Sequence, residues 1–237
     1  MLEHHVKKTR KMKKQVSVAF MISGIVFTTC LIVSNIIEQK LINIGPIEAT
    51  AGLLIFPISY ILNDIIAEVW GYKKARLIIW TGFLMNFFAV FVFRLSIVVP
   101  GSENFTHQNE FALVLGNTLR ITIASFIAFL FGSFTNAFVM SKMKIMQKGR
   151  NFSARAVVST LFGEGFDSLI FFNIAFYGMI PTKAILVLIL TQTLMKTGYE
   201  IIALPLTNYI VRWVKKHEDT DVYDEGISYN PLKVKDI

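Results

Sequence analysis

Residues 50–80, TAGLLIFPISYILNDIIAEVWGYKKARLIIW, decide the class of fold. The first twenty of them are almost all apolar, a short basic group at Lys73, Lys74 and Arg76 follows, and then a second apolar run begins. A helix needs about 20 predominantly apolar residues to cross the hydrocarbon core of a bilayer. The stretch therefore predicts the end of one membrane span, a short basic loop and the start of the next span.

The same pattern recurs along the whole chain. Of its 237 residues, 54% are hydrophobic, and only 17% are charged, against about 25% in an ordinary soluble domain. We expect six spans, at residues 16–37, 49–69, 77–98, 119–141, 156–179 and 184–211. The predicted fold is an all-α membrane protein. Its domain plan is a basic tail over residues 1–15, a six-helix transmembrane domain over 16–211 and a polar tail over 212–237.

The basic residues predict how the chain lies in the membrane. Nineteen of the 24 Lys and Arg residues fall on one side of the predicted spans, whereas the opposite loops clearly hold only Lys40 and Lys183. Because cytoplasmic loops carry an excess of Lys and Arg, both termini are expected in the cytoplasm. The net charge of +8 is then a signal of topology, and we expect no nucleic-acid partner.

Ionisable residues lie at membrane depth, where they are costly and usually functional. Counting inward at about 1.5 Å per residue places Asp167 roughly 18 Å and Lys196 roughly 20 Å from one membrane face. Their two spans are joined by a very short connection, so they should be neighbours. The sequence predicts an Asp167–Lys196 ion pair, as a tie between helices or as part of a site.

Other polar residues occupy the same region. Glu164 and Glu200 lie one turn from that pair on the same helix faces, and Asn63, Asp64 and Glu68 form a group in the second predicted span. Two interpretations of Glu68 stay open, because it lies near the end of its span: it belongs to this group, or it simply meets Arg76 or water. So many charges at related depths favour a polar, partly hydrated cavity, which indicates transport or intramembrane chemistry.

Helix-breaking and catalytic motifs add less. Pro57 and Pro205 are expected to interrupt helix hydrogen bonding inside their spans. The chain has one cysteine, no GxxxxGK[ST] loop and no HExxH motif, so we expect no cofactor, no metal and no enzymatic activity. An intramembrane enzyme that uses Lys196 as its base is the alternative from another class.

The stretch 50–80 resembles the signature of the queuosine precursor transporter family, also called the vitamin uptake transporter family. Further matches to the family pattern are Ser34, Asn35, Lys40, Arg120, Ala124, Ser125, Ala128, Arg155, Ser159, Thr160, Asp167, Ser168, Ile170, Phe171, Ala175, Phe176, Gly178, Lys196, Tyr199, Glu200, Pro205 and Thr207. Glu164 departs from the Gln that many members carry. The likeness covers nearly the whole chain.

The resemblance implies a six-helix protein of the bacterial inner membrane. Such a protein imports the deazaguanines preQ0 and preQ1 for queuosine modification of tRNA, and it is similar to the substrate-binding subunits of energy-coupling-factor transporters. A carboxylate can accept both donors of a guanine-like edge. The expected substrate-binding residues are Asn35, Asn63, Asp64, Arg120, Glu164, Asp167, Lys196 and Glu200.

Two alternatives stay open within this interpretation. The chain could be a binding subunit that needs a separate ATP-driven module, or it could import another planar heterocycle such as a vitamin. The expected partners are a small deazaguanine and the lipid bilayer, and a homo-oligomer remains open. The energy source cannot be read from the residues.

Overall fold

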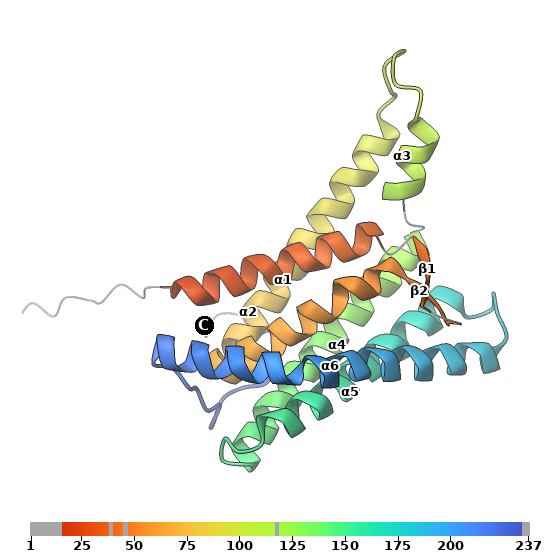
Figure 1. The fold of residues 1–237 in the computed structure, drawn as a ribbon. Helices are drawn as coiled ribbons and strands as arrows, with labels where there is room; N and C mark the ends of the chain where they lie inside the picture. Colours follow the sequence, from red (N-terminus) through yellow and green to blue (C-terminus); the bar gives the residue numbers. More distant parts are fainter. Residues whose placement is uncertain (1–15, 38–39, 45–46, 117–118, 234–237) are drawn as a thin grey trace, which may run out of the picture.

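The computed structural model describes residues 16–37, 40–44, 47–116 and 119–233 (Figure 1). The predicted N-terminal tail, residues 1–15, lies outside the described residues. The elements, in chain order, are α1 (Val18–Ile37), β1 (Leu41–Ile44), β2 (Ile47–Thr50), the 3-10 helix η1 (Ala51–Leu54), α2 (Phe56–Val98), α3 (Gln108–Leu115), α4 (Leu119–Met146), α5 (Phe152–Phe176) and α6 (Thr182–Glu218).

Within the described residues, five helical stretches are long and apolar enough to cross a membrane. They are Val18–Ile37, Pro57–Val98, Gln108–Met146, Phe152–Phe176 and Thr182–Glu218. Large apolar side chains such as Phe88, Leu194 and Ile202 are exposed along these helices, as expected for surfaces that contact lipid. The chain is therefore an all-α, multi-pass membrane protein.

Helix α2 is broken at Gly71, whose φ of 81° and ψ of 172° are not helical. The break divides α2 into residues 56–70 and 72–98, and the predicted second and third spans fall on either side of it. In Figure 1 the chain turns back where the orange first part gives way to the yellow second part. Glycine suits this position because the conformation is essentially closed to residues with a Cβ.

The start of α2 differs from the sequence-based expectation. The second span was predicted to begin near residue 49, but β1 and β2 form a small antiparallel sheet there, with Leu41 opposite Thr50, and η1 follows it. Pro57 lies in the first turn of α2, where its missing N–H costs no helix hydrogen bond. The predicted interruption at Pro57 is therefore wrong, whereas Pro205 does lie inside α6.

Helices α4 and α5 approach closely at two glycines. A Cβ added at Gly132 would lie 2.9 Å from the carbonyl oxygen of Gly163, and one added at Gly163 would lie 2.8 Å from Asn136 Cβ. Small residues at such crossings let helix backbones come together inside a membrane. The contact brings the polar side chains of α4 and α5 against the first part of α2.

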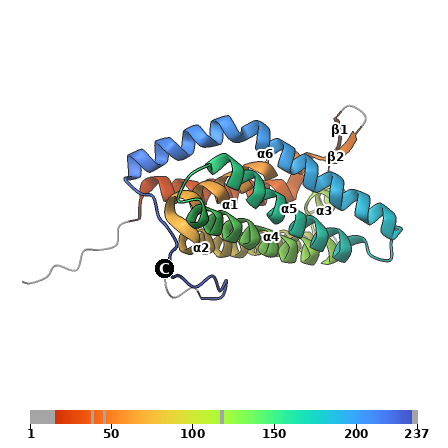
Figure 2. The same cartoon turned by 90° about the horizontal axis from the view of Figure 1, so that it is seen from below.

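Residues 219–233, which we call the strap, follow α6 and run back past α2 (Figure 2). The N–H of Val222 donates to Val69 O at 3.1 Å, and Asp224 accepts the N–H of Tyr72 at 2.8 Å. These bonds satisfy backbone groups on both sides of the Gly71 break, which a helix end would otherwise leave without partners. The strap thus completes the hydrogen bonding of the broken helix.

Candidate functional site

Lys196 on α6 lies between two carboxylates of α5. Its Nζ is 2.7 Å from Glu164 Oε2 and 3.3 Å from Asp167 Oδ2. Both carboxylates belong to buried residues. The predicted Asp167–Lys196 ion pair is confirmed, and Glu164 is the nearer of the two partners. A buried cation shared by two carboxylates leaves a net negative charge at this point of the bundle.

Asp64 and Glu200 form a second pair of buried acids beside the first. Asp64 Oδ1 accepts a hydrogen bond from Ser159 at 3.3 Å, and Glu200 lies near enough to interact electrostatically with the Asp64 carboxylate. Among the described residues, Asp64 Oδ2 and Glu200 Oε1 have no hydrogen bond of ordinary length and angle. Ionised carboxylates only accept hydrogen bonds, so this pair requires donors from elsewhere.

Asn63 extends this group to α4. Its Nδ2 donates to Asn136 Oδ1 at 2.8 Å and to Ser133 O at 3.1 Å. The Asn136 side chain also reaches the Asp64 carboxylate, whereas Asn63 Oδ1 has no hydrogen-bond partner within the part of the chain that the structure describes. One free acceptor therefore lies on an amide next to the acids.

These residues form one band at the meeting of α2, α4, α5 and α6, in which all but the half-buried Lys196 are buried. We call it the polar layer: Asn63, Asp64, Asn136, Glu164, Asp167, Lys196 and Glu200. It can offer several acceptors, an amide donor and a cation to one bound molecule. Across the described residues, no group of three or more His, Cys, Asp or Glu side chains is placed to hold a metal ion.

Two of the residues predicted to bind substrate make their contacts elsewhere. Asn35 Nδ2 on α1 donates to Asn86 Oδ1 at 2.8 Å. Arg120 is exposed and donates to the carbonyl oxygens of Ile174 and Tyr177, each at 2.6 Å. Asn35 therefore ties α1 to the second part of α2, and Arg120 binds the carbonyl end of α5.

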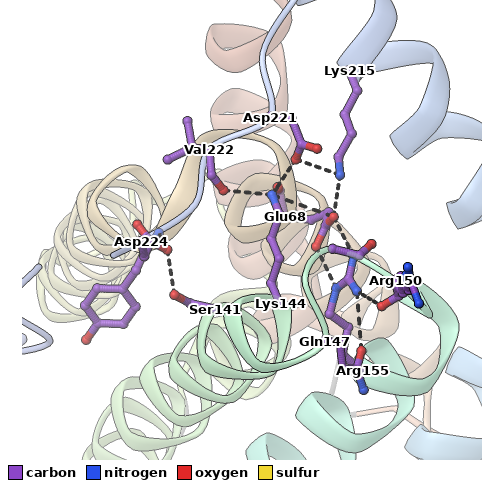
Figure 3. A network of polar contacts seen from close by, with 12 residues as sticks. Glu68, Ser141, Lys144, Gln147, Arg150, Arg155, Lys215, Asp221, Val222 and Asp224 are labelled. Atoms are coloured by element: carbon purple, nitrogen blue, oxygen red, sulfur yellow. Dashed lines mark hydrogen bonds and ion pairs between the residues drawn. The ribbon is translucent and has the colours of Figure 1, made fainter. Parts of the chain in front are cut away.

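A second group of charges surrounds Glu68, one helix turn from Asp64 (Figure 3). Glu68 is fully buried, and its oxygens accept hydrogen bonds from Arg155 at 2.7 and 2.8 Å and from Lys215 at 2.5 Å. Lys144 Nζ lies 3.8 Å from Glu68 Oε1 and also donates to the Glu68 carbonyl. The predicted Glu68–Arg76 contact is wrong, because Arg76 instead donates to Asn230 O of the strap at 2.8 Å.

Asp221 of the strap joins this group from outside. Its Oδ1 lies 2.5 Å from Lys144 Nζ and 2.8 Å from Lys215 Nζ. Burial raises the pKa of the Asp221 carboxyl, but the hydrogen bonds from these two lysines outweigh it and hold the pKa below its ordinary value. We call Glu68, Lys144, Arg155, Lys215 and Asp221 the ion cluster.

A cleft of about 380 Å³ opens beside the ion cluster, between the start of α5 and the end of α6. Its lining residues are Glu68, Gly149, Asn151, Phe152, Ser153, Arg155, Asn208, Val211, Arg212 and Lys215. On its rim Asn208 Nδ2 donates to Ser153 Oγ at 2.8 Å. In the sequence, Lys144 and Lys215 counted only toward the topology, and Arg155 counted toward the topology and the family pattern. The available hint was Glu68 itself, an acid inside a predicted span, where a charge needs a partner.

Comparison with known proteins finds relatives among transporters. The family model described as "Putative vitamin uptake transporter" matches residues 50–210. A "Probable queuosine precursor transporter" of Bacillus subtilis is 25% identical over 73% of this chain and 76% of its own length. A protein of the same name from Haemophilus influenzae is 30% identical over 55% of this chain and 53% of its own length. The "Queuosine precursor transporter" of Escherichia coli is 27% identical over 61% of this chain and 62% of its own length. No solved structure matches the chain significantly.

Proposed function

The chain belongs to the putative vitamin uptake transporter family, and on that basis we propose that it imports the queuosine precursors preQ0 and preQ1 across the bacterial inner membrane. Three similar proteins carry the name of queuosine precursor transporter, in two cases as probable. The polar layer is the substrate site in this proposal, and the imported base serves queuosine modification of tRNA.

One observation carries the choice of substrate class: Glu200 Oε1 is a buried acceptor without a donor among the described residues, beside the buried Asp64 carboxylate. A deazaguanine presents an N1–H and an exocyclic amine side by side. A carboxylate can accept both in a two-bond pair, and such charge-assisted bonds are about twice as strong as neutral ones. Binding this edge would remove the cost of burying Glu200 without a donor and would add donors to Asp64.

The other members of the polar layer fit the remaining edges of the base. The Asn136 amide, which lies beside Asp64, can donate to the O6 oxygen, and the free Asn63 Oδ1 can accept from a ring N–H. Glu164 and Asp167, held by Lys196, suit the cationic aminomethyl group of preQ1. Asn35 and Arg120 are not needed at the substrate, because their polar groups already bind Asn86 and the end of α5.

Six membrane crossings with both ends in the cytoplasm complete the proposal. The two parts of α2 would cross separately, with the turn at Gly71 beside Lys73, Lys74 and Arg76 on the cytoplasmic side. The same number of helices occurs in the substrate-binding subunits of energy-coupling-factor transporters. The ion cluster and the strap then face the cytoplasm, which supports entry of substrate from the opposite side.

The test uses a bacterium that cannot make preQ0 and lacks its own importer. Queuosine in its tRNA is measured after growth with nanomolar preQ0 or preQ1, with and without this chain. We expect queuosine only in cells that contain the chain, and none with Asp64→Asn or Glu200→Gln at equal membrane expression. Asp219→Asn, a change at an exposed residue, is the matched control and should transport normally.

Failure would be informative in two ways. If the wild-type chain is in the membrane and no queuosine appears, the proposed import by this chain alone is wrong. Binding of the radiolabelled bases to the purified protein then separates the two alternatives. Binding without transport indicates a missing ATP-driven module, whereas no binding indicates a different heterocycle.

A further inference from the structure

The ion cluster lies directly next to the polar layer. Glu68 follows Asp64 by four residues on α2, and Arg155 precedes Ser159 by four residues on α5, so each pair shares a helix face. Ser159 contacts Asp64, and Arg155 contacts Glu68, one turn further along the same seam. The Glu68–Arg155 pair therefore closes the α2–α5 seam on the side of the polar layer that we place toward the cytoplasm.

The cleft lies beyond this closure. Glu68, Arg155 and Lys215 line it, so the same side chains form both the barrier and the wall of the cleft. At about 380 Å³ it falls in the size range of small-molecule sites, roughly 300–1,000 Å³. Its other polar lining residues, Asn151, Ser153 and Asn208, suit a polar molecule in passage rather than an apolar one.

The charges of the closure have other partners to turn to. Arg155 also donates to the carbonyls of Gly149 and Arg150. Lys144 donates to Val222 O as well as to Asp221. Removing one partner from a buried ion pair is normally very costly because a bare charge remains. If Arg155 and Lys215 move away from Glu68, Arg155 keeps its carbonyl contacts and Lys144, 3.8 Å from Glu68 Oε1, stays beside the carboxylate. Lys215, whose side chain is 22% exposed, can be solvated, but it must first leave Asp221.

We propose that the Glu68–Arg155–Lys215 contact is the inner gate of the transporter, that the cleft is the exit vestibule, and that Asp221 of the strap latches the gate shut. This inference rests on the proposed function for the direction of transport. A planar base released from Asp64 would pass Glu68 into the cleft once the gate opens. Lys144 and Lys215 are the points at which the strap acts on the gate.

The test measures access to the polar layer from the gate side. Ser159→Cys places a thiol next to Asp64, above the gate, in a chain whose native cysteine is removed by Cys30→Ser. Inside-out membrane vesicles that hold the full-length protein are treated with a membrane-impermeant maleimide. We expect slow labelling with the intact gate and severalfold faster labelling when Asp221→Asn or Glu68→Gln is added.

Asp219→Asn is the matched control, because it makes the same chemical change two residues away on an exposed side chain. It should leave labelling slow. If Glu68→Gln fails to fold, Asp221→Asn decides the question, since its side chain is 42% exposed and borders the cluster from outside. If folded Asp221→Asn is labelled at the same rate as the control, the proposed gate is wrong.

The labelling needs no substrate, so it separates this inference from the proposed function. Faster labelling of the gate variants without any queuosine in the transport test would support the gate and reject import of these bases by this chain alone. Queuosine import by the wild-type chain with unchanged labelling of every gate variant would support the substrate and reject the gate.

Discussion

The Glu68 carboxylate accepts a hydrogen bond on each oxygen from the Arg155 guanidinium, at 2.8 Å to Oε2 and 2.7 Å to Oε1, and both side chains are fully buried. Such a fork-to-fork contact uses the planar geometry of arginine, which lysine does not have. It joins α2 to α5 between the polar layer and the cleft. The stability of the bundle should therefore depend on this pair.

Replacing Arg155 by Gln should lower the melting temperature of the purified protein strongly, because Glu68 keeps its charge in a buried place with fewer donors. Removal of one partner from a buried pair costs about 3–5 kcal/mol. Arg155→Lys keeps the charge and loses the fork, so its melting temperature should lie between those of Arg155→Gln and wild type. Fluorescence-detected gel filtration after heating measures this. Arg150→Lys, at an exposed position, is the control and should leave the melting temperature unchanged. Equal melting temperatures of wild type and Arg155→Gln would contradict the stabilising role of the Glu68–Arg155 pair.

Lys196→Gln should abolish uptake and reduce membrane expression. It leaves Glu164 and Asp167 facing each other without the cation that lies 2.7 and 3.3 Å from them. Adding Asp167→Asn to it removes one of the two negative charges, so expression should recover in part while uptake stays absent. Asp167→Asn alone should abolish uptake at normal expression. The measurements are tRNA queuosine and immunoblots of membranes.

Lys183→Gln is the control for this series, because Lys183 is exposed at the start of the same helix. It should leave both uptake and expression unchanged. Normal uptake by Asp167→Asn would remove that carboxylate from the substrate site.

The break in α2 can be tested with three Gly→Ala changes. Gly71→Ala should lower the melting temperature most, because two costs add up. The positive φ strains the alanine backbone by about 1–3 kcal/mol. The new Cβ would also lie only 2.7 Å from Asp224 and 2.9 Å from Val222. Gly178 has the same positive φ of 81° but no heavy atom within 4 Å of an added Cβ, so it should report strain alone. Gly198, helical and also open, should be unaffected or slightly stabilised.

The order of melting temperatures is the result that counts. If Gly71→Ala and Gly178→Ala have the same melting temperature, the contacts of the new Cβ with Val222 and Asp224 of the strap add no cost. If Gly71→Ala melts like wild type, the break itself is not required.

The strap should respond to acid in a defined range. Because the pKa of Asp221 is lower in the folded chain than the value of about 3.9 in an unfolded one, its contribution to stability is complete above that value and is lost as the pH falls through the folded pKa. The melting difference between wild type and Asp221→Asn should therefore be constant above about pH 5 and vanish in stronger acid. Asp219→Asn should show no difference at any pH, and a melting difference for Asp221→Asn that disappears near neutral pH would contradict the lowered pKa.

Counting along helices predicted correctly that Asp167 and Lys196 meet. Asp167 and Lys196 meet because helices rise uniformly and a short connection forces α5 and α6 side by side. Glu164 was placed on the right face, but its position as the nearer partner of Lys196 depends on side-chain reach, which periodicity does not encode. Asn35 and Arg120 matched the family pattern, yet their contacts lie with Asn86 and the end of α5.

Contacts between segments that are far apart in the chain could not be predicted from the sequence. Arg76 seemed a natural partner for Glu68 because it is two turns away along the chain, but the fold brings Arg155 and Lys215 to Glu68 instead. The two segments predicted as separate spans around Gly71 form two parts of one broken helix. Residues 70–76 carry no local pattern that predicts the hydrogen bond from the Tyr72 N–H to Asp224, which lies 152 positions later.

That separation has a consequence for how the protein is made. When Tyr72 enters the membrane region, Val222 and Asp224 have not yet been synthesised, since Asp224 follows Tyr72 by 152 residues. At about 5–20 residues per second, translation needs on the order of ten to thirty seconds to supply them. During that interval the polar groups beside Gly71 must be covered by water or by the insertion machinery. Until then the nascent chain exposes the backbone groups of Val69 and Tyr72 that Val222 and Asp224 later bond. A translation product that stops short of Val222 keeps these groups exposed.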